Sequence, residues 1–114
     1  MWIMMSLRTP SQRNKLRPPC PVARVADLLG DTCSLLIIRD LLRGMRRFGE
    51  LEDSLGGMSP RTLTKKLRNL EKKGLISRRS FRRHPPRVEY RLTRKGAAFS
   101  GVVEAMRAYG KKYL

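Results

Sequence analysis

The stretch from Met58 to Ile76 (MSPRTLTKKLRNLEKKGLI) constrains the fold of this chain more than any other, because it carries the signals for both ends of a helix. Ser59 and Pro60 form a start signal, since the serine hydroxyl can accept an unpaired backbone N–H and proline suits the first helical position. Gly74 is the matching stop signal. The sequence therefore predicts a helix that begins just after Ser59 and ends before Gly74.

This predicted helix has two opposite faces. Leucines recur at i, i+4 and i+7 on one face, and basic residues recur at i, i+4, i+7 and i+11 on the other. The leucines are Leu63, Leu67 and Leu70, and the basic residues are Arg61, Lys65, Arg68 and Lys72. One face is suited to burial and the other to contact with negative charge. A solvated basic face is the alternative interpretation.

The charge of the whole chain favours a polyanionic partner. Its 114 residues, enough for one domain, include 26 Lys and Arg against 9 Asp and Glu, a net charge of +17. From residue 58 to residue 95, fourteen residues are basic and two are acidic, whereas residues 21–57 hold five basic and six acidic residues. This uneven distribution indicates a localised binding surface.

Several other classes of protein are disfavoured by the sequence. No apolar run reaches the length of a membrane span, and no amphipathic helix offers bulky apolar residues for insertion into a membrane surface. Cys20 and Cys33 make no disulfide framework, so we expect a cytoplasmic protein. One His, no close pair of carboxylates and no glycine-rich phosphate loop argue against an enzyme, and no Cys or His spacing indicates a metal site or a cofactor.

The chain divides into a short arm and one domain. Residues 1–19 carry four basic residues and no acid, without clear periodicity, and we expect a flexible basic arm there. The domain, residues 20–114, should begin with a short helix that follows Cys20 and ends at Gly30. A second helix at residues 33–43 is apolar on most sides and is expected at the centre of the core.

The next elements predict a helix-turn-helix. A short extended segment at residues 46–48 should lead into a third helix at about residues 49–55. Gly56 and Gly57 then form the turn into the helix that begins at Ser59. Two helices joined by a tight glycine turn, the second with a basic outer face, are typical of DNA-binding helix-turn-helix motifs.

After the helix that begins at Ser59, the periodicity changes from helical to alternating. Residues 75–81 are mixed, and residues 82–86 (RRHPP) interrupt regular structure. Residues 87–92 alternate apolar and charged side chains, which predicts a half-buried strand. Two strands around this loop form a hairpin of the kind called a wing, whose tip residues could reach a neighbouring groove: Arg82, Arg83 and His84. The predicted fold class is mainly α with a small β hairpin, a winged helix-turn-helix.

A long final helix should follow Thr93, which is a suitable cap. Its apolar residues are spaced by alternating steps of three and four, a coiled-coil-like seam that favours a subunit interface over packing within the chain. The seam consists of Phe99, Val102, Met106, Tyr109 and Tyr113.

In this order of elements and in several phrases, the sequence resembles the HxlR-type winged helix-turn-helix regulators. The phrases are CPVARVADLLG, SLLIIRDLLRG, RRFGEL, MSPRTLTKKLRNLEKKGLI and PPRVEYRLTRKG. The resemblance implies a homodimeric DNA-binding transcription regulator of bacteria or archaea, with the helix from Ser59 in the major groove and a wing at Arg82 to Arg87. It also implies dimerisation through the first and last helices, here with Val22 and Val25 of the first. Family members usually carry Trp where this chain has Cys33.

These features together predict sequence-specific binding of double-stranded DNA by a homodimer, with repression, through exclusion of the polymerase, favoured over activation. The expected contacts to base edges are Arg61, Thr62 and Lys65. Ser59, at the start of the helix, is expected among the DNA-binding residues as well. The expected phosphate contacts are Lys66, Arg68, Lys72, Arg82, Arg83 and Arg87. A non-specific architectural DNA-binding protein and an RNA-binding protein are the alternatives, although the few aromatic residues fit the core or the seam better than RNA stacking.

Cys20 is a candidate redox sensor. It lies near a helix N-terminus, with Arg17 and Arg24 close in sequence, and both effects favour the reactive thiolate. Some HxlR-type regulators use a cysteine at this position to sense oxidants or electrophiles, so the resemblance implies the same role. An inert structural cysteine is the alternative. The nature of the effector, redox or small molecule, stays open.

Overall fold

The computed structural model describes residues 20–83 and 85–114. The expected arm at residues 1–19 and His84 of the wing lie outside the described residues. The chain divides into two units between Thr32 and Cys33. The elements are α2 (Pro21–Leu29), α3 (Thr32–Leu42), α4 (Phe48–Ser54), α5 (Pro60–Lys72), β1 (Ile76–Phe81), β2 (Arg87–Leu92), α6 (Arg94–Ala97) and α7 (Ser100–Tyr113).

The first unit contains α2, which begins and ends where the sequence predicts. Cys20 is its N-cap, and Cys20 Sγ accepts a hydrogen bond from the backbone N–H of Ala23 at 3.4 Å. Gly30 ends the helix with a φ of 81°, a conformation that glycine adopts without steric cost. None of the residues of α2 is buried.

In the second unit, α3 supplies the centre of the core, as predicted. Ile37 and Ile38 are fully buried, and Leu41 is nearly so. Asp40 is also fully buried, with Arg39 Nη2 lying 2.9 Å from Asp40 Oδ1. A buried charge is costly unless it is paired, so this ion pair allows an acid to lie in the core.

The helix α4 begins at Phe48, inside the segment that the sequence predicts to be extended. Glu50 Oε1 accepts the backbone N–H of Arg46 at 3.1 Å and that of Arg47 at 2.9 Å, which closes the first turn. These two hydrogen bonds are the main reason why the pKa of Glu50 lies below its ordinary value. The extended segment is therefore wrong at Phe48, although the carbonyl of Arg46 does pair with β2 by accepting the N–H of Tyr90 at 2.7 Å.

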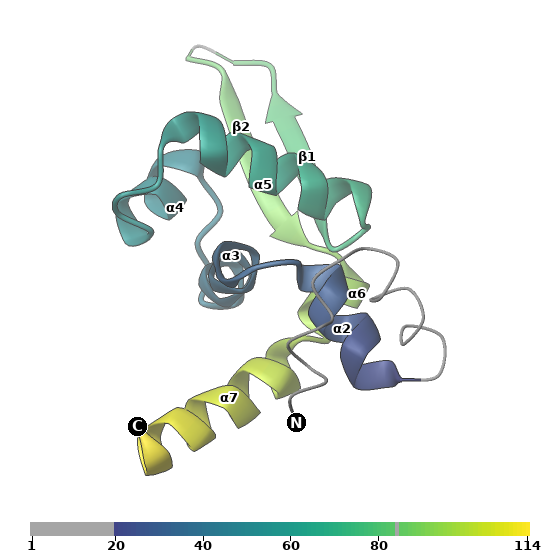
Figure 1. The fold of residues 1–114 in the computed structure, drawn as a ribbon. Helices are drawn as coiled ribbons and strands as arrows, with labels where there is room; N and C mark the ends of the chain where they lie inside the picture. The colour runs from purple at the N-terminus through teal and green to yellow at the C-terminus, as the bar shows by residue number, and fades with distance from the viewer. Residues whose placement is uncertain (1–19, 84) are drawn as a thin grey trace. The chain divides into compact units, whose positions relative to one another are not determined.

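The helices α4 and α5 form the predicted helix-turn-helix. Figure 1 shows α4 beside the N-terminal end of α5. In the turn between them, Gly57 has a φ of 93°, and the N–H of Met58 donates to the carbonyl of Leu55 at 3.2 Å. Ser59 then caps α5, with Pro60 as the first helical residue. The local start signal in the sequence thus sets the position of this helix.

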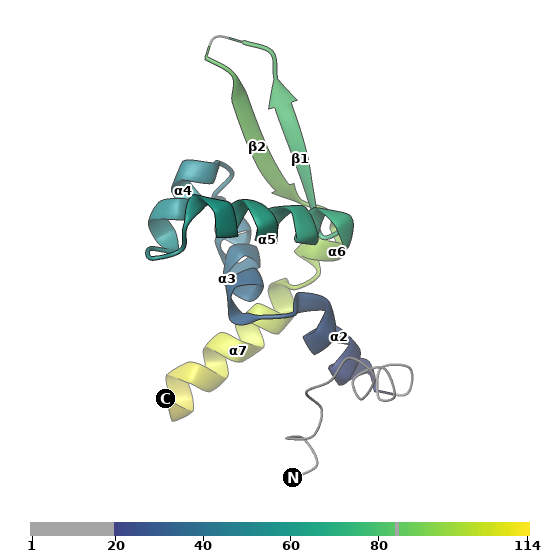
Figure 2. The ribbon, with the colours of Figure 1, turned by 45° about the horizontal axis from the view of Figure 1, so that its top comes forward.

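The strands β1 and β2 form an antiparallel hairpin, and β2 has the bounds that the alternation predicts. Figure 2 shows the hairpin projecting beyond α5, which crosses near its base. The alternation also predicts Glu89 on the solvent face, but Glu89 is only 8% exposed. Two arginines on the same strand cover it: Arg87 Nη2 lies 2.8 Å and Arg91 Nη2 lies 3.9 Å from its carboxylate oxygens.

The expected single final helix is in fact two helices, α6 and α7. Thr93 caps α6 as predicted: its hydroxyl accepts the N–H of Gly96 at 3.1 Å and donates to the carbonyl of Gly74 at 2.6 Å. Ala98 and Phe99 then form a turn, and Phe99 is 6% exposed. The interruption lies between the hydrogen bond that joins Thr93 to Gly74, just after α5, and the burial of Phe99 in the core.

This architecture confirms the predicted fold class, a mainly helical winged helix-turn-helix with a small β hairpin. Its core joins α3 to Leu51 and Leu55, to the leucines of α5, and to Leu75 and Ile76 at the base of the hairpin. Within the described residues, no helix combines the length and the apolar composition needed to cross a membrane.

Candidate nucleic-acid interface

The helix α5 presents a basic face to solvent because its leucines are held in the core. Leu63, Leu67 and Leu70 are at most 1% exposed. On the opposite side, the four basic residues that the spacing places on one face are all exposed: Arg61, Lys65, Arg68 and Lys72. Lys66, on the flank of this face, is half-buried. Long cationic side chains on an exposed helix can reach both phosphates and base edges in a major groove.

The first turn of α5 is held by its own side chains. Ser59 Oγ accepts the N–H of Thr62 at 3.1 Å and donates to Thr62 Oγ1 at 2.9 Å. The hydroxyl of Thr64 donates to the carbonyl of Pro60 at 2.8 Å. Ser59 thus acts as a cap, whereas the exposed Thr62 hydroxyl keeps its own proton for another acceptor.

The wing carries a second group of arginines. Arg82 and Arg83, close to its tip, are exposed. Arg87 forms an ion pair with Glu89, with 2.8 Å between Arg87 Nη2 and Glu89 Oε2, and the Arg87 side chain is 32% exposed. The charge of Arg87 is therefore partly balanced within the protein, so Arg82 and Arg83 are better placed to reach a phosphate.

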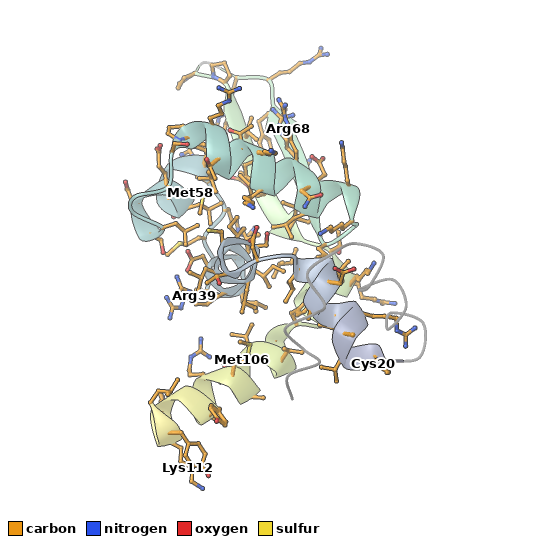
Figure 3. All side chains as sticks on the ribbon, viewed as in Figure 1. Cys20, Arg39, Met58, Arg68, Met106 and Lys112 are labelled. Atoms are coloured by element: carbon orange, nitrogen blue, oxygen red, sulfur yellow. The ribbon has the colours of Figure 1, made fainter. Side chains whose placement is uncertain are left out.

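A cleft of about 330 Å³ between α5 and the hairpin adds a basic residue that the sequence does not indicate. Arg68 of α5 and Arg78 of β1 both line it, together with Thr64 and Tyr90. Figure 3 labels Arg68 on the side of α5 that faces the hairpin. Arg78 stands opposite Tyr90 in the strand register, which turns both toward α5. The sequence of β1 has no clear alternation, so only the register reveals this position.

The predicted seam on α7 is exposed except at its first residue. The prediction that Phe99 lies in a subunit interface is wrong, because Phe99 is buried in the core of its own chain and does not contribute to an outer surface. The remaining seam residues are 41%, 51%, 62% and 62% exposed, in the order Val102, Met106, Tyr109 and Tyr113. On α2, Val22 and Val25 are exposed as well. An exposed apolar stripe of this kind is typical of an interaction surface.

The two cysteines belong to other elements than α5. Both are free thiols and both are half-buried. Cys20 takes the role of the N-cap of α2 through its sulfur, whereas Cys33 lies in the first turn of α3.

Comparison with known proteins gives a consistent result. Residues 28–114 match the model of the HxlR-like helix-turn-helix family. An uncharacterized HTH-type transcriptional regulator of Synechocystis sp., sll1512, is 45% identical over 95 residues, which are 83% of this chain and 70% of that protein. The crystal structure of PA1607 is 40% identical, with a TM-score of 0.77 over 86% of this chain and 68% of that chain. The redox regulator HypR in its oxidized form is 30% identical, with a TM-score of 0.76 over 83% of this chain and 98% of that chain.

Proposed function

Since this chain belongs to the HxlR-like helix-turn-helix family, we propose that it binds duplex DNA at specific sequences as a homodimer, with α5 in the major groove. Membership of the family makes the chain a DNA-binding transcriptional regulator. We further propose that it acts in the cytoplasm as a repressor, because a dimer bound at its site excludes the polymerase from the same DNA.

The observation that carries the proposal is the continuous exposed basic face of α5 beside a basic wing. Residues near the N-terminus of a recognition helix meet base edges, and more distant cations meet the backbone. We therefore assign base contacts to Arg61, Thr62 and Lys65, with Ser59 holding Thr62 in place. Phosphate contacts are assigned to Lys66, Arg68, Lys72, Arg82 and Arg83, with Arg78 added and Arg87 contributing less because of its bond to Glu89.

Removing a base contact and removing a phosphate contact should have different effects on DNA affinity and on sequence preference. We expect Arg61→Ala to lower affinity for the preferred site by about 1–3 kcal/mol and to relax the preference at the contacted base pair. Arg83→Ala should weaken binding to all sequences about equally. It should also reduce the slope of log affinity against log salt concentration by about one. Fluorescence anisotropy titrations on the preferred and a scrambled duplex, at several salt concentrations, measure both effects.

The matched control for this pair is Lys111→Ala, which removes one exposed charge from α7, away from α5. It should change affinity only slightly for either duplex. An Arg61→Ala protein that discriminates between the two duplexes as well as the wild type does would show that α5 is not the reading element.

We also propose that Cys20 senses oxidants, supported by its position as a cap and by the likeness to a protein described as a redox regulator. Oxidation changes the sulfur that accepts the N–H of Ala23, and so disturbs the first helix, to which we assign Val22 and Val25 of the dimer interface. A mild thiol oxidant should then weaken DNA binding by the wild type and by Cys33→Ser, but not by Cys20→Ser. Equal responses of all three proteins would leave Cys20 as a structural cap.

A further inference from the structure

We propose that the cleft between α3 and α7 binds a small organic carboxylate with an apolar body. The cleft has a volume of about 290 Å³ and lies within the second unit. Figure 3 labels two of its lining residues, Arg39 on α3 and Met106 on α7. The full lining is Leu35, Leu36, Arg39, Arg43, Val103, Met106 and Arg107.

The lining has the composition of a ligand site. Leu35, Leu36 and Val103 provide an apolar surface, and the remaining polar groups are all guanidinium groups. Sites for small molecules are mostly apolar, carry a few polar groups that fix orientation, and have volumes of about 300–1,000 Å³. At about 290 Å³ this cleft lies just below that range, so a compact ring or short aliphatic chain is the appropriate size.

The charges of the cleft select an anion. Asp40 is fully buried and holds Arg39 at 2.9 Å, so Arg39 is balanced and fixed. Arg43 lies 3.8 Å from the same Asp40 oxygen, with its side chain 52% exposed, so its guanidinium is not saturated by that contact. A guanidinium group of this kind can form paired hydrogen bonds with a carboxylate.

The other guanidinium that can turn toward a ligand comes from α7. Arg107 pairs with Glu104 one turn earlier, but the Glu104 side chain is 70% exposed. Exposed ion pairs of this type contribute little to stability, so a carboxylate in the cleft can compete for Arg107. Arg43 and Arg107 therefore approach one ligand from the two opposite walls of the cleft.

The position of Met106 connects the cleft to regulation. Met106 lines the cleft and is also 51% exposed as part of the apolar stripe that we assign to the dimer. A ligand that engages Arg107 and Met106 changes how α7 packs on α3, and so changes the distance between two recognition helices in a dimer. DNA half-sites have a fixed spacing, so DNA affinity should respond. This regulatory step rests on the proposed function, whereas ligand binding to the cleft does not.

The test uses 2-naphthoate and, as an uncharged control of the same shape, 2-naphthamide, titrated into the full chain by isothermal calorimetry. We expect naphthoate to bind and the amide to bind about tenfold or more weakly, since hydrogen bonds to a charged group are the stronger ones. The double variant Arg43→Gln with Arg107→Gln should lose about tenfold or more of the naphthoate affinity. The matched control, Lys111→Gln with Lys112→Gln, also removes two positive charges, from residues of α7 that do not line the cleft, and should bind naphthoate as the wild type does.

Three results would overturn the site: no binding of naphthoate, equal binding of naphthoate and naphthamide, or equal loss of naphthoate affinity in the two double variants. DNA binding is then measured separately, on a selected duplex with and without naphthoate. A protein that binds naphthoate but no specific duplex would contradict the proposed function while supporting the cleft. A protein that binds a specific duplex but no naphthoate would contradict the cleft while supporting the proposed function.

Discussion

Replacing Val102 and Met106 by glutamate is expected to convert the protein into monomers and to lower its DNA affinity by about 10²–10⁴-fold, the gain that linking two binding modules can provide. Both side chains lie in the exposed apolar stripe of α7, at 41% and 51% exposure. In a two-fold dimer each glutamate would face the partner's apolar stripe without a counter-charge, which is costly. In a monomer the same glutamates remain in water. Sedimentation velocity measures the change in mass.

The control for this prediction places the same two charges elsewhere on α7. Gly101 and Ala108 are exposed and point away from the stripe, so Gly101→Glu with Ala108→Glu should remain dimeric and bind DNA nearly as the wild type does. A Val102 and Met106 variant that stays dimeric would place the interface on another surface. A monomeric variant with unchanged DNA affinity would show that the protein does not need two copies to bind its site.

The second large effect is expected at Gly96, where a single added methyl group should destabilise the fold. A Cβ at this position would lie 2.0 Å from the carbonyl oxygen of Leu75 and 3.0 Å from Leu92 Cδ2. The obstacle at 2.0 Å is backbone, and Thr93 ties α6 to the same region through the carbonyl of Gly74, so neither side can easily move. Gly96→Ala should therefore lower the free energy of unfolding toward the upper end of the range of about 1–3 kcal/mol that is typical of overpacking.

The matched substitution is Gly101→Ala, in α7, where an added Cβ meets nothing within 4 Å. Alanine restricts the unfolded chain and favours helix, so this variant should be more stable than the wild type by about 0.4–1 kcal/mol. Urea unfolding of both variants measures the difference. If Gly96→Ala were as stable as Gly101→Ala, α6 would not pack against Leu75 as the structure has it.

The elements that the sequence predicts well are those whose signals are local. Ser59, Pro60 and Gly74 define α5 within a few residues of its observed ends, and the leucine spacing identifies its buried face. The strand β2 has the predicted bounds because strict alternation is a signal contained in six residues. The exposure of the basic face of α5 follows from the same spacing, without knowledge of the rest of the fold.

The features that could not be predicted depend on contacts between distant residues. The break between α6 and α7 arises where Gly96 meets Leu75, twenty-one positions earlier, and where Phe99 turns into the core. Nothing in the spacing of the seam separates Phe99 from Val102. Arg78 likewise joins Arg68 only through the pairing of β1 with β2. Each of these features depends on tertiary packing, so the periodicity of a single helix or strand cannot predict it.

Selection of binding sites from a pool of random duplexes shows whether α5 reads DNA sequence. We expect enrichment of a two-fold symmetric sequence whose half-sites are about 10–10.5 base pairs apart, or a multiple of that spacing. The enriched duplex should stay bound in the presence of excess random DNA, and selection with Arg61→Ala should lose one preferred base pair in each half-site. A chain with a net charge of +17 can bind any DNA tightly, so tight binding alone does not distinguish specific from non-specific recognition. A pool that binds tightly but shows no enriched sequence would mean that α5 does not read DNA sequence and would indicate a non-specific architectural protein.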